Sequence, residues 1–156
     1  MVNYDEIIKE VEQQENELQF NEFTNATALN IGLSLVDRAK KENKSITIEI
    51  NRNGHQLFHY SCEGTSPDND QWVARKCNVV RRFNHSSHYM WAKVSQAGTT
   101  LEDRFKVSSA EFASSGGAFP VIVKNVGVIG AIAVSGMAQE VDHQWVVDAI
   151  RAYIGK

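Results

Sequence analysis

Proline and cysteine are scarce in this sequence, whose 156 residues include two of each. Cys62 and Cys77 do not form the multiple-cysteine pattern of a small secreted scaffold, and they lack metal-ligand spacing. A chain of this length buries about 68–70% of its unfolded surface, so its core needs neither disulfides nor a structural metal. We therefore expect two free thiols in a cytoplasmic protein.

Long apolar runs and an excess of basic charge are also missing. No stretch reaches the roughly 18 uncharged apolar residues of a membrane span, and the acidic, amphipathic N-terminus resembles no signal or transit peptide. Sixteen Lys plus Arg against nineteen Asp plus Glu leave a formal charge of -3, which argues against a nucleic-acid footprint. We expect neither a membrane nor a nucleic acid as partner. Without repeats or linkers, residues 1–156 are expected to form a single domain.

In the first half of the chain, the spacing of apolar residues changes once, from helical spacing to strict alternation. Apolar residues recur at helical spacing over residues 3–18 and again after Asn25, a candidate N-cap, to about residue 41. Isoleucines then alternate with polar residues over 46–50, and Asn53-Gly54 joins this run to HQLFHY. This pattern predicts a β-hairpin. Either face of its second strand could be the buried one.

The second half predicts four helices and a second hairpin. A loop over 63–70, with Asp68, Asn69 or Asp70 as cap, leads into one helix, and a second short helix covers about 87–97. The capping-box spacing after Ser108 predicts a short helix through Phe112. The runs FPVIV and VIGAIAV predict two central strands, apolar on both faces. The closing helix is expected to bury Val141, Trp145, Val146, Ala149, Ile150 and Tyr153. The order predicts an α/β fold, an antiparallel sheet flanked by helices.

The apolar strand region is dense in glycine, with Gly116-Gly117 before it and Gly127, Gly130 and Gly136 within or after it. Two explanations remain open. The glycines allow tight turns and close packing, or they let a ligand lie against bare backbone beside a helix N-terminus. The spacing matches neither GxGxxG nor a Walker loop.

Histidines are the candidate chemical groups, and each has a structural alternative. His143 lies in the first turn of the last helix, where it either faces a cleft or is an exposed polar residue. His59 either hydrogen-bonds backbone in the core or projects into a pocket. His85 and His88 have a spacing that could hold a metal, but without a nearby carboxylate we favour a surface loop and expect no metal site.

A basic stretch with aromatic residues lies between residues 72 and 93. Cations interleaved with aromatics can bind RNA, but these aromatics fall on the apolar helical face, which favours core positions for them. The cations are then left for solvent or an anionic small ligand. The stretch contains Arg75, Lys76, Arg81, Arg82 and Lys93 with Trp72, Phe83, Tyr89 and Trp91.

Three runs in the chain resemble a known family. RNGHQLFHYSCEGTSPDNDQWVARK, GTTLED and GGAFPVIVKNVGVIGAIAVSGMAQEVDH are similar to the UPF0303 proteins, a branch of the haem-degrading HbpS-like superfamily, and the likeness extends from about Glu15 to Ile154. The resemblance implies a profilin-like sandwich that assembles into dimers or larger homo-oligomers. It also implies binding of haem or related tetrapyrroles and, in some members, oxidative breakdown of the haem.

Haem iron takes an axial His, Cys, Met or Tyr, or the haem is held mainly through its propionates and rings. The matching positions of this chain that could serve are His59 and His143, with Arg75 and Lys76 as partners for the propionates. Many relatives carry a His directly before the paired glycines, where this chain has Ser115.

The leading hypothesis is a homo-oligomer that binds a small anionic or haem-like ligand between the glycine-rich strand and the TSPDN loop. No catalytic residue is assigned. The alternative is a non-enzymatic structural or partner-binding assembly protein. The expected ligand-binding residues are His59, Asn69, Trp72, Arg75, Gly117, Phe119, Ser135 and His143.

Overall fold

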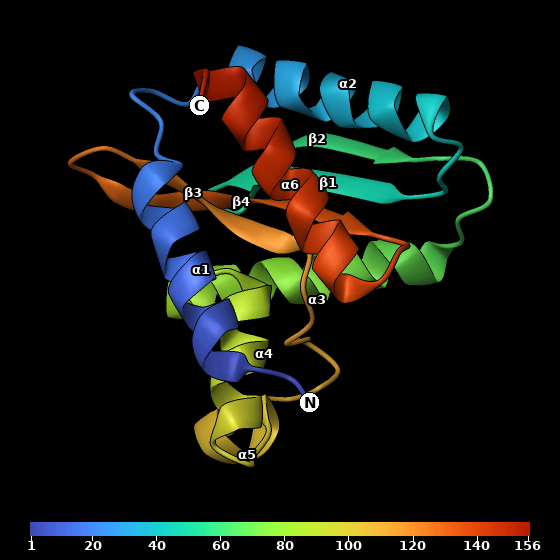
Figure 1. Ribbon diagram of the computed structural model, residues 1–156. Helices are drawn as coiled ribbons and strands as arrows, with labels where there is room; N and C mark the ends of the chain where they lie inside the picture. Colours follow the sequence, from blue (N-terminus) through green and yellow to red (C-terminus); the bar gives the residue numbers. More distant parts are fainter.

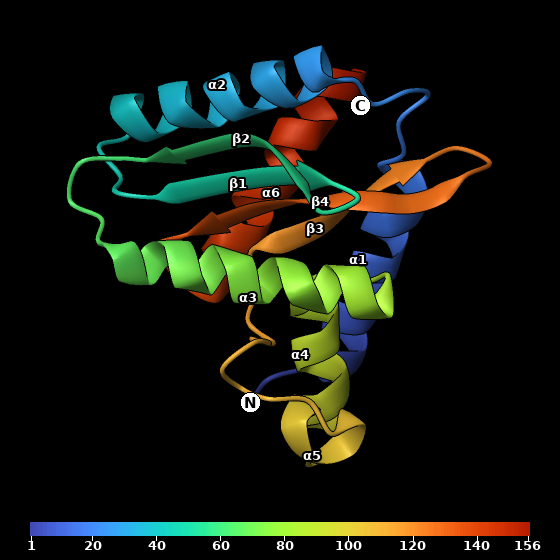
Figure 2. The ribbon, with the colours of Figure 1, turned by 180° about the vertical axis from the view of Figure 1, so that it is seen from behind.

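A four-stranded antiparallel sheet forms the centre of the structure, a computed structural model that describes residues 1–156 (Figure 1). Its strands lie in the order β2 (His55–Ser61), β1 (Thr47–Arg52), β4 (Gly127–Ser135) and β3 (Ala118–Val123). Helices cover both faces, as the view from behind also shows (Figure 2). The predicted α/β fold, with its antiparallel sheet flanked by helices, is confirmed. No helix has both the length and the apolar character needed to cross a membrane.

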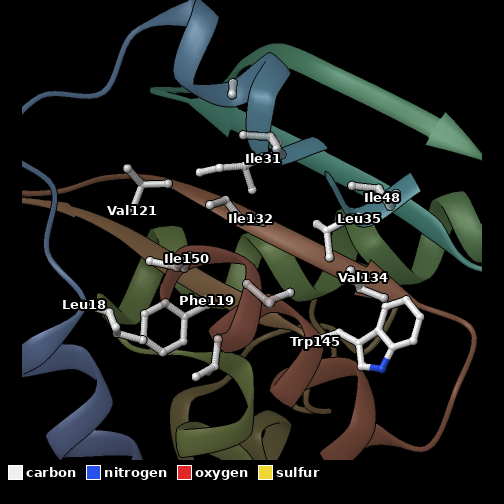
Figure 3. Packing of buried hydrophobic residues seen from close by; sticks show 14 of the residues in the cluster. Leu18, Ile31, Leu35, Ile48, Phe119, Val121, Ile132, Val134, Trp145 and Ile150 are labelled. Atoms are coloured by element: carbon white, nitrogen blue, oxygen red, sulfur yellow. The ribbon is translucent and has the colours of Figure 1, made fainter. Parts of the chain in front are cut away.

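Large apolar side chains fill the space between one face of the sheet and two helices, α2 (Asn25–Lys41) and α6 (Gln139–Ile154) (Figure 3). Alternate strand residues point to opposite faces, so Ile48 of β1 and Ile132 and Val134 of β4 all point toward these helices. Trp145 of α6 packs against the same cluster. This face holds the main hydrophobic core.

The opposite face is narrower and more polar, and α3 (Pro67–Phe83) packs on it. Its contacts are the small side chains of Ala118, Ala131 and Ala133, which allow the helix to lie close to the sheet. On β1 the residues of this face include the buried, polar Glu49. The α3 face therefore offers polar groups at its margin, and the candidate site lies there.

The two C-terminal strands occupy different positions in the sheet. β4 is central and apolar on both faces, as predicted, whereas β3 is at the edge, so the expectation of two central strands is wrong for β3. Pro120 suits an edge because it donates no ladder hydrogen bond. The outer border of β3 is covered by Phe20, whose amide donates to Ile122 O at 2.8 Å and whose carbonyl accepts from Lys124 N at 2.9 Å.

Three further helices pack together at one side of the sheet: α1 (Tyr4–Glu17), α4 (Ser87–Gln96) and α5 (Leu101–Phe105). The sequence predicted the first two and missed α5, which Thr100 caps by accepting from Asp103 N at 3.2 Å. The helix expected after Ser108 is wrong. The Ser108 hydroxyl accepts from Ala110 N at 3.1 Å and closes a local turn instead.

Helix starts and buried faces differ from expectation in detail. Asn25 is the first residue of α2 rather than its cap, which is Thr24, and α3 begins at Pro67 after the cap Ser66. In α6, Val141 and Tyr153 are exposed instead of buried.

Candidate functional site

A buried ion pair links α3 to α6 at the end of β4. Lys76 Nζ donates to Asp142 Oδ2 at 3.3 Å and to Val134 O at 3.2 Å. The side chains of Lys76 and Asp142 are 3% and 2% exposed. Burying two charges is costly unless they are paired and hydrogen-bonded, so this pair is a specific feature of the fold.

The surroundings shift the titration of both partners. Burial lowers the pKa of Lys76, although Asp142 opposes that shift. Burial likewise raises the pKa of Asp142 to about 6, against the effect of Lys76 and of backbone amides such as Met137 N, which donates to Oδ1 at 3.0 Å. Burial therefore disfavours the charged form of each partner, and their mutual attraction opposes this effect.

Gly117 provides the room for this pair. Its φ of +139° lies in a region that L side chains rarely adopt, and an added Cβ would lie 2.7 Å from Lys76 Nζ. Both explanations of the glycines apply at Gly117. The missing side chain allows close packing against Lys76, and it leaves bare backbone beside the site.

A cleft of about 300 Å³ opens beside the buried pair. Hydroxyls of Ser115 and Ser135, the amide of Asn69 and the ammonium of Lys76 supply hydrogen-bond donors to it. Asn69 is held at the rim because its side-chain oxygen accepts from Ser66 N at 3.0 Å. We call this cavity the lysine cleft. Its lining residues are Asp68, Asn69, Trp72, Lys76, Ser115, Ser135, Gly136, Met137 and Asp142.

Several of the predicted ligand-binding residues come together here. Asn69, Trp72 and Ser135 line the lysine cleft, and Gly117 lies directly behind it against Lys76. Arg75 stacks over Trp72 at 4.2 Å and donates to Ser109 O at 3.2 Å, so it lies at the outer side of the indole. Trp72 is half-buried at the cleft rather than in the core.

The structure places His59 and Phe119 outside the lysine cleft. His59 Nδ1 lies 2.7 Å from Glu49 Oε1 and its Nε2 lies 3.1 Å from Asp70 Oδ1, so carboxylates engage both ring nitrogens. Phe119 is fully buried in the main core. The alternation of β3 explains this, because Ala118 faces α3 and Phe119 faces α6.

His143 lies in a different cavity. Successive helix residues point about 100° apart, so when Asp142 faces the lysine cleft, His143 faces α1 and α4. Its Nε2 lies 2.7 Å from Gln14 Oε1, and burial lowers its pKa to about 3. Its ring centroid is 4.8 Å from that of His88, which is buried rather than in a surface loop as expected.

The resemblance named Lys76 as a propionate partner, but the basic stretch around it was left for solvent or an anionic ligand, so its burial was not predicted. Asp142 was missed as a site residue. One signal was present, since Lys76 follows Val73 by three residues and precedes Val80 by four, which places it on the apolar face of α3.

Comparison with known proteins agrees with this fold. Residues 23–151 match a family model described as "Haem degrading protein HbpS-like". The chain belongs to the HbpS-like family. A UPF0303 protein of Streptomyces coelicolor is 42% identical over 149 residues, which cover 96% of this chain and 94% of that protein. The predicted membership is thereby confirmed.

Solved structures share the architecture of this chain. The crystal structure of the Ybr137w protein superposes with a TM-score of 0.88 at 32% identity, covering 95% of this chain and 87% of that one. A PduOC:Heme complex has a TM-score of 0.70 at 17% identity over 83% of this chain and 94% of that one. The latter likeness shows a shared fold.

Proposed function

We propose that this HbpS-like protein binds a small ligand through a carboxylate or a similar anionic group in the lysine cleft. The observation that carries the proposal is the ammonium of Lys76, which has three N–H donors, of which two meet Val134 and Asp142. The third is available to a ligand. A charge-assisted hydrogen bond in a site shielded from water is stronger than one at the surface.

The other cleft residues give the ligand its orientation. Ser115 and Ser135 lie on separate segments and can donate hydroxyl protons to the same anionic group. The half-buried indole of Trp72 supplies an apolar face for the body of the ligand. A volume of about 300 Å³ is at the small end of ligand pockets, so only one end of a larger molecule would be enclosed.

A tetrapyrrole is the ligand class that the family description and the heme complex of the fold neighbour favour. The lysine cleft fits the propionate edge of such a molecule, with Lys76 for the carboxylate and Trp72 beside the ring. It supplies no imidazole to the iron, because the nitrogens of His59 are engaged and His143 lies elsewhere. We therefore assign the carboxylate edge to this chain's residues and derive no iron chemistry and no breakdown step from them.

Titration with hemin and with iron-free protoporphyrin tests the proposal. Both should bind with similar affinity, because the contacts are to propionates rather than to iron. Lys76→Met and the milder Ser135→Ala should weaken both, by about tenfold and about threefold. His59→Ala is the matched control and should change neither. Hemin binding that protoporphyrin does not reproduce, or equal affinity in Lys76→Met, would contradict the proposal.

We also infer that the chain self-associates through the edge of β2 and the neighbouring surface of α2. No strand pairs with the outer border of β2, and Leu29, Leu33 and Tyr60 beside it are 49%, 51% and 39% exposed. Gly32 lets α2 approach this strand, since an added Cβ would lie 2.5 Å from the Phe58 ring. An unpaired edge with apolar neighbours favours pairing with another chain.

Sedimentation of the wild type and of Leu33→Glu tests this surface. The wild type should sediment as a dimer or larger species and the variant should shift toward monomer, with Val126→Glu as the control because Val126 is exposed in the distant β3–β4 turn. A monomeric wild type would contradict the inference, and a variant of unchanged size would exclude this surface. We further infer a cytoplasmic location, because Cys62 and Cys77 are both free thiols.

A further inference from the structure

A second cavity, the histidine chamber, lies between α1, α4 and α6 and is separate from the lysine cleft. Its volume is about 480 Å³. None of its lining residues is shared with the cleft. The lining residues are Val2, Ile7, Glu10, Val11, Gln14, His88, Trp91, Gln139, Glu140, His143 and Gln144.

The inner wall of the chamber carries an unsatisfied hydrogen-bond acceptor. His143 is 4% exposed, and its Nε2 must carry the proton that is donated to Gln14 Oε1 at 2.7 Å. The ring is neutral, because burial and the nearby His88 lower its pKa. Its Nδ1 is then a bare lone pair, and it has no partner in the chain. A buried polar atom without a partner costs free energy, so this nitrogen requires an explanation.

His88 repeats the same feature on the facing helix. Burial lowers the pKa of this imidazole, and its Nδ1 also lacks a hydrogen-bond partner. The ring stacks on Trp91 at 5.3 Å with an interplanar angle of 12°. Two neutral imidazoles and an indole therefore form one aromatic wall that carries no positive charge.

The rim of the chamber is acidic. Glu10 of α1 and Glu140 of α6 are exposed and line opposite sides, while no Lys or Arg lines the cavity. Ile7 and Val11 add an apolar strip on α1. Carboxylates and the face of an indole both attract a cation, whereas an anion would meet only repulsion here.

We propose that the histidine chamber binds a small organic cation, a primary amine joined to a planar or apolar body. The apolar body packs against Trp91 and the α1 strip. The ammonium lies between the rim carboxylates and beside the aromatic wall. The chamber thus selects the charge opposite to the one that the lysine cleft selects.

A pair of probes of equal size and opposite charge tests the proposal. Calorimetric titration with 2-phenylethylamine should show binding, and 3-phenylpropionate should not bind at this site. The combined Glu10→Gln and Glu140→Gln variant should bind the amine about tenfold more weakly, since both exposed carboxylates contribute to its attraction. Glu12→Gln, an exposed change on the same helix outside the chamber, is the control and should leave the affinity unchanged.

Histidine ¹⁵N spectra give a readout that locates the amine. Binding should shift the Nδ1 resonances of His88 and His143 and leave those of His55 unchanged. Ser135→Ala, which weakens the lysine cleft and keeps its buried ion pair, should not affect the amine, so this proposal and the proposed function fail separately. Absence of amine binding at about 10 mM, equal binding of the propionate at the chamber, or an unchanged affinity in the double variant would overturn the proposal.

Discussion

Lys76 and Asp142 meet inside the protein at 3.3 Å, although 66 positions separate them in the chain. The contact joins the middle of α3 to the first turn of α6, and the carbonyl of Val134 adds the end of β4 to the same ammonium. Removing one member of such a pair leaves an uncompensated charge in a water-poor site. The pair therefore links α3, β4 and α6, and it also lines the lysine cleft.

Lys76→Met should lower the free energy of unfolding by about 3–5 kcal/mol at pH 7.5, because Asp142 then remains buried without its partner. Adding Asp142→Asn should recover part of the loss, since a neutral amide needs no counter-ion. Urea denaturation of the wild type, of Lys76→Met, of Asp142→Asn and of the double variant measures the coupling energy between the two residues. Independent, additive effects of the two substitutions would show that the contact does not stabilise the fold.

Gly117→Ala should destabilise the protein by about 2–4 kcal/mol, because the backbone has positive φ and the new methyl group would collide with the backbone oxygen of Val134 as well as with Lys76 Nζ. Gly98→Ala is the matched control: its φ is +71° and an added Cβ meets no atom within 4 Å. The control should cost about 1 kcal/mol, from backbone strain alone. Thermal unfolding compares the two, and equal losses would argue against crowding at Gly117.

Stability should fall as the pH drops below 6.5, through His143. Its pKa is lowered to about 3 in the folded protein, whereas the unfolded chain takes up the proton near 6.5. His143 therefore does not reduce the free energy of unfolding above pH 6.5. As the pH falls toward 3 it lowers this free energy progressively, by about 2 kcal/mol at pH 5. His88 acts in the same direction.

Asp142 acts in the opposite direction, so the test compares variants. Its pKa is raised to about 6 from 3.8, and the folded state therefore gains stability relative to the unfolded state as the pH falls through this range. His143→Gln should flatten the acid loss measured by urea titration at pH 7.5, 6 and 5. Gln144→Ala, on the exposed side of α6, should leave the slope unchanged.

Ser115→His should give the lysine cleft the imidazole that it lacks. Ser115 lines the cleft and directly precedes the paired glycines Gly116 and Gly117. Hemin bound to this variant should show a shifted Soret band, since iron gains a nitrogen ligand. Ser114→His, one residue earlier and outside the cleft lining, is the control. A band identical to that of the wild type would place the porphyrin iron away from residue 115.

The sequence alone was sufficient for the sheet and for most helices because hydrophobic period is a local property. Ile46 to Ile50 alternate and α2 repeats every three to four residues, and both patterns persist in the fold. The short α5 was missed because it depends on the cap of Thr100 and on packing of the buried Leu101, which no period reveals.

The candidate site was predicted in part, for a physical reason. Asn69, Trp72 and Ser135 follow turn and glycine signals that lie close to them in the chain. The contact between Lys76 and Asp142 joins distant parts of the chain, so no local pattern predicts it, and a charged residue in a helix is ordinarily solvated. His143 was assigned to the cleft because the sequence pattern did not predict which of the adjacent residues Asp142 and His143 faces it.

The covering of β3 by Phe20 leaves the sheet with a single open border at β2. Two chains that pair through this border would form one continuous sheet. Both outer edges of that sheet would be β3 strands, each covered by Phe20. Growth by strand addition therefore stops at two copies, and any bigger particle has to be built through other surfaces. The same chain segment that connects the first two helices thus guards against fibre formation.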